Sequence, residues 1–240
     1  MTRDPTPGAQ ADGPALLALM QLSDTALPIG RHAHALGLER LLRDGRVPDE
    51  KRLRQIVVSA LMQGGARCDG AAASLAHQAL TSGNGSRLLA IDARLDCLKL
   101  TDAAQAASRR CGRRLAGLAP SLSRDAVLAD YAAAIAAGRS PGHLAVISAA
   151  ILAACGVSRP AAVLMEMRGI ATMILSAAVR LDILPAAASQ AMLASLAPEI
   201  LAASRIALAT ALDEMECSAA AVIETAVMRH ARDHGRLFAT

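Results

Sequence analysis

The sequence predicts an all-α fold, a single-domain helical bundle of about nine to eleven helices counted from start and stop signals. Hydrophobic residues make up 53% of the 240 residues, and most are Ala and Leu, which are strong helix formers. Val, Ile, Thr and aromatic residues are much rarer, and no segment shows the two-residue alternation of a strand. Residues 1–13 lack an apolar core and are predicted to be a disordered lead-in, which leaves 14–240 as the helical domain.

The helices of the first half are separated by proline and glycine. Pro28 and Gly30 interrupt the chain, because proline lacks a backbone donor and glycine tolerates turn angles. Asp49 is expected to cap a helix that Gly64 and Gly65 end. The predicted helices of this half span about residues 14–22, 32–44, 49–63, 69–80 and 86–98.

The helices of the second half carry clearer caps. Thr101 and Ser123 are expected to cap two successive helices, which Pro120 and Gly138 end. Ser158, followed by a proline in the first turn, begins a long helix. The predicted helices here span about 102–119, 124–137, 142–155 and 159–184, with further helices divided by Pro185 and Pro198.

Charge and aromatic content argue against a nucleic-acid partner. The formal charge of +4 comes almost entirely from Arg, since Lys51 and Lys99 are the only lysines, and it is interleaved with Asp and Glu. The single Tyr131 and single Phe238 leave little for base stacking. The densest basic group, which a solvated helix face or an acidic protein partner would explain, is Arg109, Arg110, Arg113 and Arg114.

Cysteine spacing and hydropathy predict a cytoplasmic protein that does not enter a membrane. The five cysteines are odd in number, widely spaced and without a Cys-x-x-Cys pair, which indicates reduced thiols rather than a disulfide framework or zinc ribbon. The longest charge-free run, Ser140–Ser158, contains Pro and Gly and is predicted to be a buried helix.

Motifs for catalysis are missing from the sequence. It has no G-x-x-x-x-G-K-[ST] phosphate loop, no G-x-S-x-G elbow and no H-E-x-x-H zinc motif, so we do not expect the chain to bind a nucleotide through a phosphate loop. The carboxylates at 213, 214 and 216 are explained by an exposed charged patch.

Two histidine pairs are candidate metal ligands or contact residues. His32 and His34 flank one alanine, and His230 and His234 share a helical face at i and i+4, a spacing that suits Ni, Cu or Zn. Two ligands do not close a site, so no metal is assigned and polar surface groups are the simpler interpretation. The alternative function is a helical metal-dependent enzyme whose metal is bound by His230, His234 and a nearby carboxylate such as Asp233 or Glu224.

Five motifs in order, from about Leu16 to Thr240, resemble the UreF family of urease accessory proteins. SDTALPIGRHAHALGLE (residues 23–39) resembles its N-terminal signature S-D-S/T-A-L-P-I/V-G followed by G-L-E. SRRCGRRL (108–115) resembles S-x-x-M-G-R-x-L, with Cys111 in place of Met. The remaining matches are GHLAVISAAILAACGV, LSAAVRLDIL with LAPEI, and the tail MRHARDHGRLFAT. The signature's Phe/Tyr and second Ser are replaced by residues 31–35, and Ala231 stands where the family has Glu.

This resemblance implies an all-helical, non-enzymatic chaperone that tends to dimerise. Proteins of the family act with UreD (also called UreH) and the GTPase UreG on apo-urease, and GTP hydrolysis accompanies nickel insertion into the urease active site. The missing phosphate loop agrees with nucleotide chemistry residing in the GTPase. An unrelated helical scaffold is the other alternative.

The resemblance also points to two partner-binding regions, a bend after the first helix and the C-terminal tail. Loops on rigid scaffolds commonly carry contacts, and Phe238 beside Arg236 has the composition of an interface anchor, with burial of Phe238 in the chain's own helices as the alternative. The predicted partner-binding residues are Pro28, Gly30, His32, His34, Gly37, Glu39, His230, Arg236, Leu237 and Phe238.

Overall fold

The computed structural model describes residues 13–217, 221–230, 233, 237 and 238, and within these ranges it is all-helical without a strand, as predicted. The predicted lead-in lies outside the described residues except for Gly13, which begins the first helix. The N-terminal half contains α1 (Gly13–Ser23), η1 (Arg31–Ala33), α2 (Leu38–Arg43), α3 (Glu50–Ser59), η2 (Ala60–Gly70), α4 (Ala71–Thr81) and α5 (Gly85–Leu98). The C-terminal half contains α6 (Asp102–Leu122), α7 (Ala126–Ala136), α8 (Leu144–Ala154), α9 (Arg159–Arg180), α10 (Ala186–Ser195), α11 (Ala197–Ala209) and α12 (Ala221–His230).

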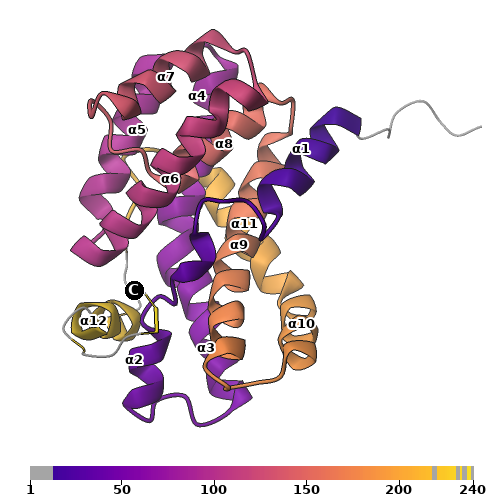
Figure 1. The fold of residues 1–240 in the computed structure, drawn as a ribbon, viewed down its shortest axis with the longest axis vertical. Helices are drawn as coiled ribbons and strands as arrows, with labels where there is room; N and C mark the ends of the chain where they lie inside the picture. The colour runs from indigo at the N-terminus through magenta and orange to yellow at the C-terminus, as the bar shows by residue number, and fades with distance from the viewer. Residues whose placement is uncertain (1–12, 218–220, 231–232, 234–236, 239–240) are drawn as a thin grey trace, which may run out of the picture.

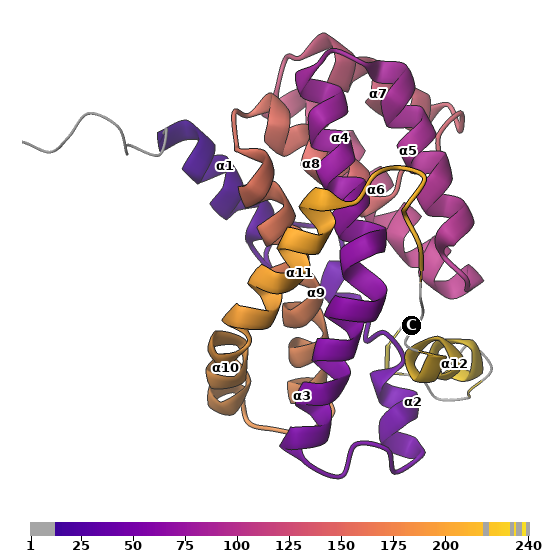
Figure 2. The same ribbon diagram turned by 180° about the vertical axis from the view of Figure 1, so that it is seen from behind.

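The α3, η2 and α4 segments form one continuous rod (Figure 2). The prediction that Gly64 and Gly65 end a helix is therefore wrong. The chain passes through them as the π-helical stretch η2, which packs against α9 and α11. Burial between two helices outweighs the low helix propensity of glycine there.

The predicted helix over 32–44 is also wrong in its first half. Arg31–Ala33 forms only the 3₁₀ turn η1, and α2 begins at Leu38. Leu36 and Gly37 have φ of 48° and 73°, in the left-handed region, so a right-handed helix cannot run through them.

The helix ends of the C-terminal half agree with the predicted caps and stops, except at Ser123 and Pro120. Thr101 and Ser158 cap α6 and α9 through their side chains, as predicted. Asp125 rather than Ser123 caps α7, by accepting from the Leu128 amide at 2.9 Å. Pro120 lies inside the last turn of α6, because proline removes only its own donor and the Ser123 amide still bonds the Ala119 carbonyl.

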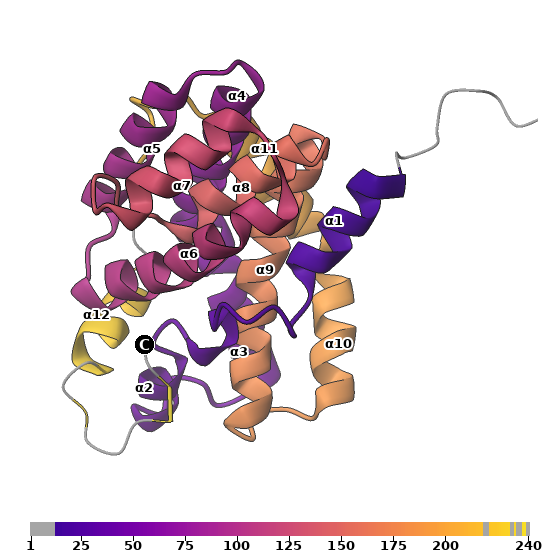
Figure 3. The same cartoon turned by 45° about the horizontal axis from the view of Figure 1, so that its top comes forward.

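Two clusters of buried side chains make up the core. One joins α4, α5, α6, α7 and α8, and the other joins α2, α3, α9, α10, α11 and α12. Figure 1 shows the first group at one end of the molecule and α2, α3, α10 and α12 at the other, with α9 and α11 between them. Both clusters include residues of α9, and the rod also passes from one to the other. Figure 3 shows α1 projecting from the body where it meets α9 and α8.

Apolar helices lie mainly inside the fold. The charge-free run forms the buried helix α8, as predicted. In the described part of the chain, α9 alone is long and apolar enough to cross a membrane, and the bent pair α10–α11 would be a second if it counted as one span. Because 67% of the apolar window of α9 is buried, α9 has the surroundings of a core helix.

Candidate partner-binding site

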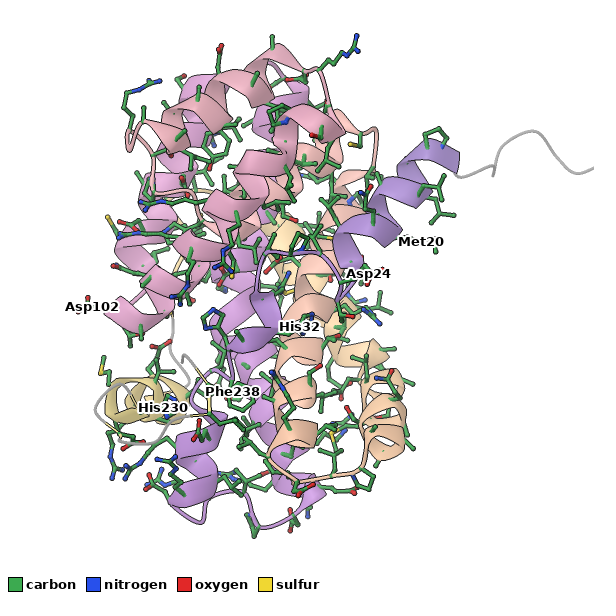
Figure 4. The ribbon with its side chains drawn as sticks, viewed as in Figure 1. Met20, Asp24, His32, Asp102, His230 and Phe238 are labelled. Carbon is green, nitrogen blue, oxygen red and sulfur yellow. The ribbon has the colours of Figure 1, made fainter. Side chains whose placement is uncertain are left out.

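The loop over residues 24–37, between α1 and α2, is one half of the candidate site. It crosses α9, and Figure 4 shows Asp24 and His32 along it. Gly30 turns the chain into η1 with φ of 81°, a left-handed conformation that favours glycine. Arg31 anchors the loop to α9 through a bidentate ion pair with Glu166, whose distances are 2.8 and 3.1 Å. Pro28 is exposed on this loop.

The two histidines of the loop have different surroundings. His34 is only 5% exposed, and burial, followed by the charge of Arg110, lowers its pKa to about 4. His32 is half-buried, and burial, Arg31 and Arg180 lower its pKa. Both rings are therefore neutral at pH 7.

A cavity of about 150 Å³ lies behind the loop, between η2, α6, α9 and α12. Lys99 and Asp69 form an ion pair of 2.9 Å in its wall. Glu224 of α12 also lines it, and burial raises the pKa of this carboxyl, with Lys99 acting in the opposite direction. The cavity is thus mainly apolar with a few buried charges.

The C-terminal tail is the other half of the candidate site, and it meets the N-terminal signature at Glu39. This carboxylate of α2 is 4% exposed. Its oxygens accept hydrogen bonds from the Leu237 and Phe238 amides, each at 3.1 Å, and from Arg43 at 2.7 Å. Glu39 therefore joins the N-terminal signature, to which it belongs, to the C-terminal tail.

His230 lies inside the same network. The ring is fully buried, and its Nε2 lies 3.3 Å from the Phe238 carbonyl and 3.6 Å from Glu39. Asp233 lies 3.6 Å from the other ring nitrogen and accepts from Arg40 at 2.8 Å. Figure 4 shows His230 and Phe238 side by side.

The structure separates the two predicted tail side chains. Phe238 is 4% exposed and packs in the second core cluster, with Arg180 over its ring at 4.3 Å from the centroid. Burial in the chain's own helices, the alternative to an exposed anchor, is therefore what the structure shows for Phe238. Leu237 is 63% exposed. Arg236 and His234 lie outside the described residues.

Gly37 brings α2 and α12 together. Its φ is 73°, and a Cβ there would lie 2.9 Å from both the Ala226 Cβ and the Val227 nitrogen. Gly37 thus meets α12, and Glu39 meets the tail. Arg180 of α9 links His32 to the tail, because it donates to the His32 carbonyl and lies over the Phe238 ring.

A polar cluster at the start of α8 was not predicted from the sequence. The Ser108 hydroxyl lies 3.0 Å from His143 Nδ1, and His143 Nε2 lies 2.8 Å from Asp96. The same hydroxyl accepts from the Leu144 amide at 3.3 Å, so this array caps α8 and joins it to α5 and α6. Only the Ser in the 108–115 motif gave a signal, because its partners lie 12 and 35 residues away.

The described residues contain no group of three or more His, Cys, Asp or Glu side chains placed to hold a metal ion. His230 of the second predicted pair is enclosed by Glu39, Asp233 and the tail. The enzyme alternative therefore gains no support from the residues that the structure describes.

The fold and the site define an all-helical protein whose N-terminal signature and C-terminal tail are assembled on one helix, α2. A sequence model of the UreF family matches residues 47–197. The chain is 29% identical over 223 residues to the urease accessory protein UreF of Yersinia enterocolitica, covering 93% of this chain and 97% of the relative. It is 30% identical over 166 residues to UreF of Yersinia pestis, covering 69% and 72%. The chain belongs to the UreF family of urease accessory proteins.

Proposed function

We propose that this chain is a non-enzymatic chaperone of urease maturation. It acts in the cytoplasm as a homodimer, with UreD and the GTPase UreG on apo-urease, and supports GTP-dependent insertion of nickel into the active site. It needs no cofactor of its own, and neither nucleic acid nor a membrane is a partner. Family membership supports this proposal. The observation that carries it is the contact of the signature residue Glu39 with the tail, because the N-terminal signature and the C-terminal motif of the resemblance then lie together in the fold.

Deletion of the gene in a host that carries the same urease cluster tests the proposal. Urease purified from the deletion strain should lack nickel and activity, and the wild-type chain should restore both. Affinity capture of the tagged chain should recover UreD and UreG. Nickel-loaded, active urease formed without the chain would contradict the proposal.

Nucleotide binding by UreG alone is the second expectation of the proposal. Because the sequence has no phosphate loop, titration of labelled GTP against the isolated chain should give no saturable binding at micromolar concentrations. The same titration against UreG is the positive control. Saturable binding to the isolated chain would contradict this division of roles.

A further inference from the structure

The loop over residues 24–37 is surrounded by positive charge. Arg31 lies within it, and four exposed arginines from neighbouring helices meet it. Arg114 of α6 donates to the Ile29 carbonyl at 3.4 Å, and Arg180 of α9 donates to the His32 carbonyl. The remaining two are Arg110, whose charge acts on His34, and Arg168, which lines a small cavity together with Asp24 and His32.

These charges are poorly compensated. Within the described part of the chain, none of the four exposed arginines lies within 4.0 Å of a carboxylate. Glu166, the carboxylate of α9 beside the loop, is already paired with Arg31.

The geometry of the arginines favours recognition over simple solvation. Arg114 and Arg180 are held in place by backbone carbonyls, which fix the guanidinium groups without neutralising their charge. The nearby imidazoles of His32 and His34 respond to this positive potential with lowered pKa values, beyond the effect of burial. Guanidinium groups held in this way bind carboxylates through paired hydrogen bonds.

We propose that Arg110, Arg114, Arg168 and Arg180 form a docking surface for a carboxylate-rich surface of a protein partner. A protein is favoured over nucleic acid because the only aromatic residues of the chain, Tyr131 and Phe238, are both buried and cannot stack on bases. That the partner is a component of the urease maturation complex rests on the proposed function.

A fluorescent deca-glutamate peptide is the first probe, with binding measured by anisotropy at increasing salt. R110E/R114E should weaken binding at least tenfold at low salt and flatten its salt dependence. The matched control is R87E/R139E, which reverses two exposed arginines that have no ion pair in the described residues and lie away from the loop. R110E alone keeps the Arg114 bond to the loop and should weaken binding about threefold, with an unchanged circular dichroism spectrum.

Equal weakening by the control pair would overturn the proposal, because net charge would then explain the result. Tighter binding of a DNA duplex with the same number of charges would overturn the assignment to a protein partner. The second probe is affinity capture of UreD and UreG at low and moderate salt, which R110E/R114E should abolish and the control should retain. If the wild-type chain captures neither, the proposed function fails and the peptide result still decides this proposal. If it captures both and R110E/R114E does so equally well, only the docking surface is refuted.

Discussion

The Glu39 carboxylate stabilises contacts between residues almost 200 positions apart. Its two oxygens accept from the backbone amides of Leu237 and Phe238, while Arg43 balances its charge. A buried carboxylate is costly without such partners, so the acid and the tail stabilise each other. The family signature pointed to Glu39 but carried no information about the tail amides that it accepts from.

Substitution of Glu39 by Gln should detach the tail. Whichever oxygen is replaced by an amide would face a donor, so the free energy of unfolding should fall by about 2 kcal/mol. Hydrogen exchange at the Leu237 and Phe238 amides and urea unfolding measure the two effects. E199Q is the control, because the Arg54–Glu199 pair is partly exposed and should contribute less than about 1 kcal/mol. Unchanged amide exchange in E39Q would contradict this role.

His34 should make the protein sensitive to mild acid. Burial and Arg110 lower its pKa to about 4 in the folded chain, whereas an unfolded histidine titrates near 6.5. Between these values the unfolded chain binds a proton that the folded chain does not, so stability falls as pH falls. Between pH 7 and pH 5 the loss should be about 2 kcal/mol, measured by urea unfolding. H34Q should lose less over the same range, and an identical pH dependence would contradict the assignment.

At the scale of elements, the sequence predicts a helix start correctly where the capping side chain and the amide it accepts from are a few residues apart. Ser158 and Thr101 are examples, because a side-chain oxygen that accepts from an amide three residues on is visible in the sequence. The failure at Gly64 and Gly65 has a tertiary cause, since α9 and α11 cover that stretch of the rod. The break at Leu36 comes from backbone angles that the residue type disfavours.

The junction of α2 with α12 should depend on Gly37. G37A places a methyl group 2.9 Å from two atoms of α12 in addition to the left-handed backbone strain. Gly45 is the matched control, because its φ is 68° and a Cβ there would meet nothing within 4 Å. G45A should therefore cost about 1–2 kcal/mol from backbone strain alone, and G37A more. Urea unfolding compares the two variants, and equal losses would show that α12 does not depend on this contact.

At the scale of the whole molecule, the abundance of Ala and Leu and the absence of a two-residue alternation were enough to predict the all-α class. The clusters of polar residues were not predictable. Glu39 meets the tail, and Ser108 meets His143, across distances in sequence that no local pattern spans. Resemblance to a family pointed to two regions without their geometry, and it could not distinguish buried Phe238 from exposed Leu237.

The two tail residues allow folding and partner binding to be separated. F238A removes a buried ring from the core and should lower the free energy of unfolding by about 3–5 kcal/mol. For a chain of this size the melting temperature should then fall by roughly 6–20 °C. L237A changes a side chain that is 63% exposed, so its stability should stay within about 0.5 kcal/mol of wild type.

Capture of UreD by these variants tests the role of the tail as a partner-binding segment. L237A should no longer capture UreD, because the exposed Leu237 side chain is the part of the tail that a partner can cover. Its thermal denaturation curve should stay that of the wild type, because this side chain is not part of the core. A truncation after Arg229 removes both residues and should combine the two losses. If L237A captures UreD at full affinity and F238A loses capture only above its own melting temperature, the tail serves the fold alone. Contact with the partner would then have to come from the loop over residues 24–37.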